Sequence, residues 1–187
     1  MANHFRTSQI ICFLAVSLAI FLMPIVDGRA DQGDPLLILS NKVNESAEHY
    51  IGIPYKWGGN PDKEPFADCS HLVTAVLKRS LRSSGIELHP TEMNTTLIKA
   101  KTHTISRKDA RPGDIVFFQM SKKETGYNVG IITNINNAVE FTHVSTTRGV
   151  ISTSTNFDSW NYYWKDRLHS FRRWNTDIFK TTLNKTP

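Results

Sequence analysis

The stretch Tyr55-Lys56-Trp57-Gly58-Gly59, followed after a short polar linker by Asp68-Cys69-Ser70-His71-Leu72-Val73, is the part of the sequence that decides the fold. Its paired glycines and Pro61 predict a loop. The apolar residues from position 72 onward then recur at the spacing of an amphipathic helix that reaches about Leu81. Cys69 is therefore expected in the first turn of that helix.

Two opposing effects act on the thiol of Cys69 at this position. The unpaired amides and the positive end of the helix dipole favour an anion, so they should help the thiol to ionise. Asp68 is placed to cap the helix by accepting hydrogen bonds from first-turn amides, but its own charge opposes a thiolate next to it. A catalytic cysteine here needs a further activator.

The first thirty residues have the pattern of an export signal. His4 and Arg6 precede an apolar run from Ile10 to Val26, and small residues follow at positions 28 and 30. We predict a signal peptide over residues 1–30 and a protein exported to the periplasm or cell envelope, or secreted. An uncleaved membrane anchor is the alternative, because the run is just below the ~18 apolar residues that favour a span.

Composition bounds the rest of the chain. With 187 residues, 40% of them hydrophobic, one core and one domain over residues 31–187 are expected. Residues 1–30 hold two of the 22 basic and one of the 17 acidic side chains, which leaves 20 against 16 and a net charge of +4. That charge suits an acidic polymer such as cell-wall material, or it is simply a solvated surface. No basic run with interleaved aromatic residues indicates a nucleic-acid partner.

Cysteine usage points to chemistry at one position. Cys12 lies in the predicted signal, so Cys69 is the single thiol of the mature chain. An exported protein that used cysteine structurally would be expected to pair it in a disulfide. Cys69 is thus either a reactive group or a small buried hydrophobic residue.

The remaining patterns predict an α+β protein, with helices first and short antiparallel strands after them. Asp34 and Pro35 begin a helix that runs to about Tyr50, and a short helix is expected between positions 91 and 100. Strands are predicted at residues 114–118, 128–133, 139–145, 149–154 and 168–174. Arg172 and Arg173 in the last of these are interpreted as solvated charges of an edge strand. The aromatic residues between Trp160 and Trp164 fit packing in the core better than a sugar platform.

Two of these strands should form a hairpin through a four-residue loop at positions 134–137. That loop length would place Gly130 opposite Phe141, where the glycine leaves room for the ring. It would also place Asn128 opposite His143, on the face that meets Cys69. An apolar face would then end in a polar pair.

Several ordered motifs together resemble the NlpC-type cell-wall peptidases, which are papain-like cysteine hydrolases that cut peptidoglycan stem peptides. The likeness covers roughly residues 47–174. The motifs are Tyr-Ile-Gly-Ile-Pro-Tyr-Lys-Trp-Gly-Gly, Asp-Cys-Ser followed by Leu-Val, Arg-Pro-Gly-Asp-Ile-Val-Phe-Phe, Val-Gly-Ile-Ile, Phe-Thr-His-Val-Ser and Tyr-Trp-Lys-Asp-Arg-Leu. The resemblance implies a papain-like NlpC-type fold in which the cysteine helix packs on an antiparallel sheet.

The same resemblance assigns residues to a site. Cys69 matches the nucleophile, and Tyr55, Asp68 and Ser70 match residues that line the substrate cleft. His143 matches the residue that orients the base. Asn128 stands where the family has its catalytic histidine.

Asn128 is the main departure from the family pattern. A carboxamide has no titratable proton near neutral pH, so it cannot act as a general acid or base, a role worth ~10²- to 10⁴-fold in rate. Three other histidines come into question as a base. His143 would have to move towards Cys69, His71 replaces the usual glycine and points to another helix face, and His103 cannot be placed.

Two functions follow. The first is an exported cysteine peptidase that cleaves peptidoglycan stem peptides, with Cys69 as nucleophile. The second is a catalytically silent wall-binding module of the same fold. The expected partner is peptidoglycan or muropeptides, with no nucleic acid and no membrane after signal cleavage. No metal or cofactor motif is visible in the sequence.

Overall fold

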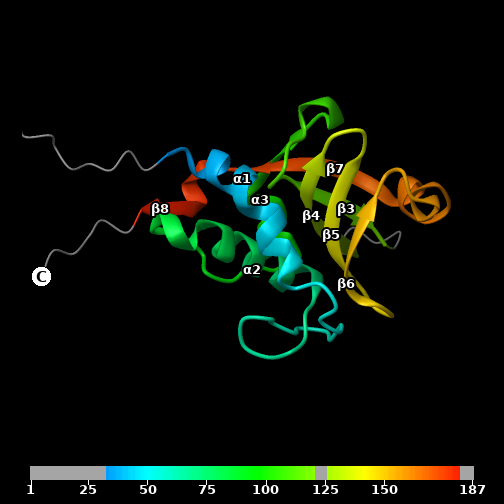
Figure 1. Cartoon of the computed structure of the whole chain (residues 1–187), viewed down its shortest axis with the longest axis horizontal. Coiled ribbons are helices and arrows are strands. Elements are labelled where there is room, and N and C mark those ends of the chain that lie inside the picture. The colour runs from blue at the N-terminus through cyan, green and yellow to red at the C-terminus, as the bar shows by residue number, and fades with distance from the viewer. Residues whose placement is uncertain (1–32, 121–125, 182–187) are drawn as a thin grey trace, which may run out of the picture. The chain divides into compact units, whose positions relative to one another are not determined.

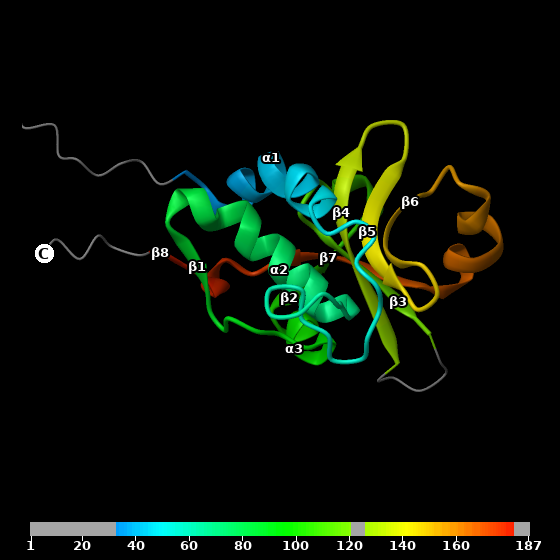
Figure 2. The same ribbon diagram turned by 60° about the horizontal axis from the view of Figure 1, so that its bottom comes forward.

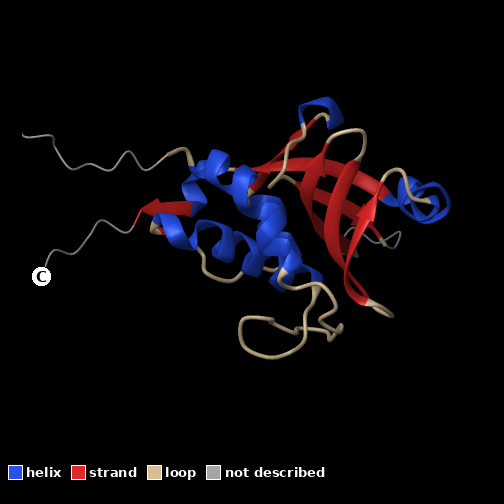
Figure 3. Cartoon of the chain, in the orientation of Figure 1, coloured by secondary structure: helices blue, strands red, loops and turns tan. Residues whose placement is uncertain are grey.

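The computed structural model describes residues 33–120 and 126–181, so the predicted signal segment lies outside the described residues. Figure 1 shows helices gathered beside a twisted sheet, and Figure 3 shows the same division by secondary structure. The helices are α1 (Pro35–Glu48), α2 (Cys69–Leu81) and α3 (Thr95–Ala100). The predicted α+β class is confirmed.

A six-stranded antiparallel sheet has the strand order β2-β7-β3-β4-β5-β6. Its strands are β2 (Thr102–Ile105), β3 (Ile115–Gln119), β4 (Tyr127–Ile135), β5 (Val139–Ser145), β6 (Gly149–Ser154) and β7 (Leu168–Trp174). Strands β1 (Ile86–Leu88) and β8 (Phe179–Thr181) form a separate pair. In the described part of the chain, no helix is long and apolar enough to cross a membrane.

The two faces of the sheet are covered by different elements (Figure 2). Val129 and Ile131 of β4 belong to a cluster with the buried residues of α1 and α2. Phe141 of β5 belongs to a second cluster with Trp160 and Trp164, which lie in the π-helical turn Trp160–Trp164. Trp160 and Trp164 are therefore core residues, as predicted, whereas the prediction is wrong for Tyr162, which is exposed. Side chains alternate between faces along a strand, so β4 contributes to both clusters.

The predicted register of the β4–β5 hairpin is wrong by two residues. Gly130 pairs with His143 and Ile132 with Phe141, and the register shifts between Ile132 and Asn134. The causes are a bulge at this shift and a β4 strand that continues to Ile135, which leaves a three-residue connection. A Cβ on Gly130 would lie 3.1 Å from the Phe141 ring and 3.2 Å from the Cβ of His143. Glycine at this position therefore gives room to both residues.

The interpretation of Arg172 and Arg173 as edge charges is also wrong, because β7 lies inside the sheet between β2 and β3. Arg173 forms two hydrogen bonds with the carboxylate of Asp114, at 2.9 and 2.7 Å, and Asp114 is only 2% exposed. Arg172 donates to the Thr102 hydroxyl and to backbone oxygens of the same region. Both arginines therefore hold the sheet together.

Candidate active site

The Asp68 cap places Cys69 as the first residue of α2. The Asp68 carboxylate accepts hydrogen bonds from the His71 amide at 2.8 Å and from the Ser70 hydroxyl at 3.0 Å. The bond from the His71 amide satisfies one of the backbone groups that a helix start leaves unpaired, as the sequence predicted. Ser70 itself is buried. Its position next to Asp68 makes it a support for the cap.

The loop that carries Tyr55 is fastened directly to the residues before Cys69. Tyr55 forms a parallel bridge with Ala67, and the Asp68 amide donates to the Gly59 carbonyl at 2.9 Å. A Cβ on Gly59 would lie 2.9 to 3.0 Å from neighbouring backbone atoms, so the approach requires glycine. Tyr55 is partly buried, whereas Trp57 is 87% exposed and is no core residue. The two parts of the defining stretch thus form one unit.

Burial dominates the ionisation of the nucleophile candidate. It raises the pKa of the Cys69 thiol to about 11, and the charge of Asp68 adds to the rise. The backbone amide of Val129 and the first-turn amides act in the opposite direction but do not compensate. The resting thiol is neutral at pH 7. The proximity of Cys69 to the Val129 amide places α2 against the beginning of β4, one residue after Asn128.

His143 is a fully buried, neutral imidazole. Its Nε2 lies 3.0 Å from the Thr153 hydroxyl, and its ring centroid lies 4.6 Å from that of Trp164. Burial lowers the pKa of His143 to about 4. At neutral pH the ring can orient a partner by hydrogen bonding, but it carries no charge. The ring lies next to the aromatic rings of Trp164 and Phe141.

Asn128 shares the face of His143, but the two residues are not directly opposite. Because Gly130 pairs with His143, Asn128 is a diagonal neighbour, a placement for which roughly 7–8 Å is typical. The face is that of Trp164, since Val129 and Ile131 are the residues turned towards the helices. That the Asn128 and His143 side chains lie close to the Cys69 thiol stays a prediction. Asn128 directly precedes Val129, whose backbone amide lies at the thiol, so its place in the chain is one residue from the contact with Cys69.

A cavity of about 350 Å³ adjoins Asn128 and His143, and Cys69 does not contribute to its lining. Other lining residues are Ser145, Arg148, Tyr162 and Tyr163. Asn128 Oδ1 and His143 Nδ1 are buried without a hydrogen-bond partner, and the Asn128 amide donates only weakly, to the Val144 carbonyl at 3.4 Å. Two buried polar atoms without partners are costly unless a ligand or water completes them.

Tyr162, Tyr163 and Arg148 were not among the predicted site residues. Tyr162 is 74% exposed although it lies between the two buried tryptophans of its turn. The close succession of aromatic residues was the available signal, but only the π-helical turn determines which of them point outward. Arg148 follows β5 and comes to the cavity through the connection to β6.

The remaining histidines are held elsewhere. His71 Nδ1 lies 3.0 Å from Asp68 Oδ2, although this contact lacks hydrogen-bond geometry. His103 is exposed on β2, and its Nδ1 lies 2.9 Å from the side-chain oxygen of Asn175. Within the described residues, no three His, Cys, Asp or Glu side chains are grouped so that they could hold a metal ion.

A capped cysteine helix packed on an antiparallel sheet defines a papain-like class of protein. The model of the NlpC/P60 family matches residues 52–173. The chain therefore belongs to the NlpC/P60 family, and the predicted resemblance is confirmed.

Three relatives indicate the range of this likeness. The chain is 30% identical to a protein called Probable endopeptidase NlpC from Escherichia coli K12. The aligned 146 residues are 78% of this chain and 84% of that protein. It is 30% identical to the Murein DD-endopeptidase MepS/Murein LD-carboxypeptidase of the same strain, over 72% of this chain and 63% of that protein. It is 31% identical to the Gamma-DL-glutamyl hydrolase of Bacillus subtilis 168, over 70% of this chain but only 28% of that longer protein.

Proposed function

We propose that this protein is an exported cysteine peptidase that cleaves peptide bonds in peptidoglycan stem peptides, with Cys69 as the nucleophile. The observation that carries the proposal is the place of Cys69 as the first residue of a helix capped by Asp68, in a chain of the NlpC/P60 family. The names of the relatives, which include murein endopeptidases, support the substrate class. Residues 1–30 would act as the export signal.

In this reaction, the Cys69 sulfur attacks the amide carbonyl as its proton is lost, and the carbonyl becomes an oxyanion. Backbone amides at the start of α2 lie where they can stabilise that charge. The C–N bond then breaks, the departing amine gains a proton, and water hydrolyses the thioester. Tyr55 and Asp68 would line the substrate cleft, with the Asp68 carboxylate near a free amino group of the stem peptide.

Proton transfer is the weak step of this mechanism. Asn128 can accept and donate hydrogen bonds but cannot take the thiol proton. His143 is buried, and its lowered pKa of about 4 means that the neutral ring is a weak base, which takes up a second proton only below about pH 4. With the pKa of Cys69 raised to about 11, the enzyme should be slow compared with one that has a positioned histidine.

The same two pKa values favour a second candidate function, a wall-binding module that has kept the cleft and lost its turnover. Digestion of purified muropeptides followed by mass spectrometry separates the two. A peptidase yields products with a newly formed amine within the stem peptide. A binding module leaves the masses unchanged yet sediments with insoluble peptidoglycan. If the protein neither cleaves nor sediments, both functions are wrong.

A further inference from the structure

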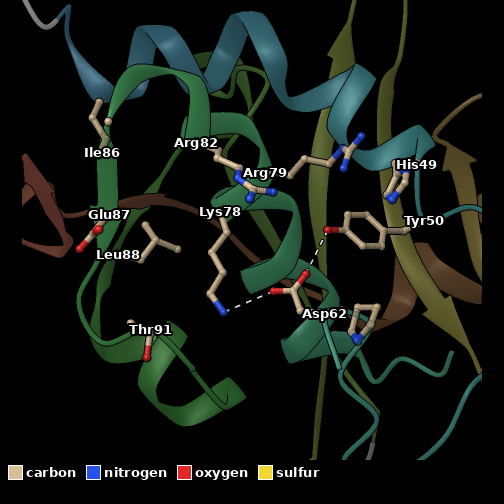
Figure 4. Close-up of a pocket in the computed structure, with 12 residues that line it drawn as sticks. His49, Tyr50, Asp62, Lys78, Arg79, Arg82, Ile86, Glu87, Leu88 and Thr91 are labelled. Atoms are coloured by element: carbon tan, nitrogen blue, oxygen red, sulfur yellow. Dashed lines mark hydrogen bonds and ion pairs between the residues drawn. The ribbon is translucent and has the colours of Figure 1, made fainter. Parts of the chain in front are cut away.

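A second hollow lies far from the candidate active site, beside the last turns of α2. Its volume is about 690 Å³, and Figure 4 shows its walls formed by the end of α1, by α2 and by β1. Its polar lining includes His49, Tyr50, Asp62, Lys78, Arg79 and Arg82. Arg79 lies in α2 ten residues after Cys69, which places its backbone roughly 15 Å along the helix axis from that of Cys69.

The Asp62 carboxylate, which lines this hollow, already has two partners in neighbouring residues. Asp62 lies 3.4 Å from the Lys78 ammonium and accepts a hydrogen bond from the Tyr50 hydroxyl at 3.2 Å. Burial, followed by the charge of Asp62, raises the pKa of Tyr50 to about 12, so the phenol remains a neutral donor. Figure 4 shows Tyr50 and Lys78 converging on Asp62. The direct partners of Asp62 are thus Lys78 and Tyr50 and neither of the two arginines.

Arg79 and Arg82 are both exposed, and within residues 33–120 and 126–181 their side chains form no ion pair. Figure 4 draws no hydrogen bond to either side chain. Arg79 lies close enough to Tyr50 for its charge to act on the phenol, which places it at the wall of the hollow. Both arginines also line a neighbouring hollow of about 420 Å³, together with Lys42 and Glu45, which pair with each other at 3.8 Å. Glu87 is the other carboxylate of the larger hollow, so its lining carries more positive than negative charge.

The helix dipole explains only part of this arrangement. A cation near the end of α2 gains from the negative pole of the helix, which accounts for Arg79. Arg82 lies after the end of α2, in a short 3-10 turn. The helix dipole does not explain why the surface beside Arg79 and Arg82 is concave. Buried Leu88 and Ile86 of β1 add apolar surface to the same hollow. Two guanidinium groups without an ion-pair partner, next to an apolar wall, suit a ligand that has an oxyanion group and a less polar part beside it.

We propose that the hollow at Arg79 and Arg82 is a binding site for an oxyanion, either a phosphate or a carboxylate, carried by an anionic polymer or metabolite. The anion lies between the two guanidinium groups, and the rest of the ligand lies against Tyr50 and Leu88. Each guanidinium donates through its planar fork, which matches the geometry of phosphate and carboxylate oxygens. Because the site is remote from Cys69, binding of the anion there requires no cleavage of the ligand. This inference is independent of the proposed peptidase activity.

The test is isothermal titration calorimetry on the full mature chain at low ionic strength. Inorganic pyrophosphate and tricarballylate are the two probes, and they distinguish phosphate from carboxylate as the preferred anion. We expect one of them to bind, and we expect the combined variant Arg79→Gln and Arg82→Gln to weaken that binding at least ten-fold. The matched control is Lys108→Gln with Lys165→Gln, which removes the same charge from exposed positions outside the hollow and should change the affinity less than two-fold.

Two results would overturn the proposal. One is the absence of binding of both probes at millimolar concentration. The other is an equal loss in the arginine variant and in the lysine control, which would mean that only the overall charge matters. If circular dichroism shows that the glutamine pair does not fold, the pair Arg79→Lys and Arg82→Lys decides. It keeps the charge but loses the forks, so binding should still weaken at least three-fold, and unchanged binding would count against the site.

Discussion

The raised pKa of Cys69 predicts how the native thiol reacts with iodoacetamide. Only the thiolate is alkylated, so the rate follows the fraction of ionised thiol. A pKa of about 11 in place of the reference value of 9.0 leaves roughly 10² times less thiolate at pH 7 to 8. The rate constant should therefore start roughly 10²-fold below that of a free thiol. It should keep rising about ten-fold per pH unit up to about pH 10, without a plateau.

Asp68→Asn provides the matched perturbation. Asparagine caps a helix about as well as aspartate, so α2 should begin at the same residue. The lost charge was raising the pKa of the thiol, so the variant should alkylate faster at every pH below the plateau. The rates are measured by intact-protein mass spectrometry from pH 6 to 11, with N-acetylcysteine as the reference.

Three results would refute this reasoning. A labelling midpoint near or below the free-thiol value of about 8.5 would mean that an activating group outweighs burial. A slower Asp68→Asn variant would mean that Asp68 assists the thiolate. Labelling that appears only after denaturation would mean that Cys69 is a core residue, and the site assignment would fail.

Three further predictions concern the sheet. Asn128→His should raise peptidase turnover by about 10²-fold or more, measured on muropeptides, because it supplies a titratable base; a folded variant with unchanged turnover would contradict this. Arg173→Met should lower the free energy of unfolding by about 3–5 kcal/mol in urea titrations, because the buried carboxylate of Asp114 loses its ion-pair partner and keeps only the hydrogen bond from the Arg111 amide. Lys108→Met is its exposed control, and a loss below about 1 kcal/mol in Arg173→Met would show that water reaches Asp114. The lowered pKa of His143 stabilises the fold above pH 6.5, and about 3 kcal/mol of this should be lost as the pH falls from 6.5 through 4. His143→Gln should remove that pH dependence, and an unchanged dependence would assign it to other groups.

Local signals in the sequence predicted the parts of the fold that depend on neighbouring residues. The start of α2 follows from Asp68 as cap and from the apolar spacing after it, and the structure places both as expected. The short strand from Gly149 to Ser154 follows likewise from its composition and length. These features need no knowledge of distant contacts.

The features that could not be predicted from the sequence depend on contacts between residues that are far apart in the chain. The bulge near Thr133 changed the register of β4 on β5, and no local residue marks it. Arg173 pairs with Asp114, which is 59 residues away, so its burial was invisible in a pattern typical of an edge strand. The position of Asn128 relative to His143 depends on this register, which the motif alone could not determine.

The measurement that tests the central claim most directly is the release of stem-peptide fragments by the wild type and by Cys69→Ala, with intact-protein mass recorded after acid quenching. The thiol is the proposed nucleophile, so the wild type should release fragments and show an adduct of the acyl fragment's mass whenever hydrolysis of the thioester is the slower step. Cys69→Ala should release none and carry no adduct. Fragment release that continues at the wild-type rate in Cys69→Ala would contradict the account.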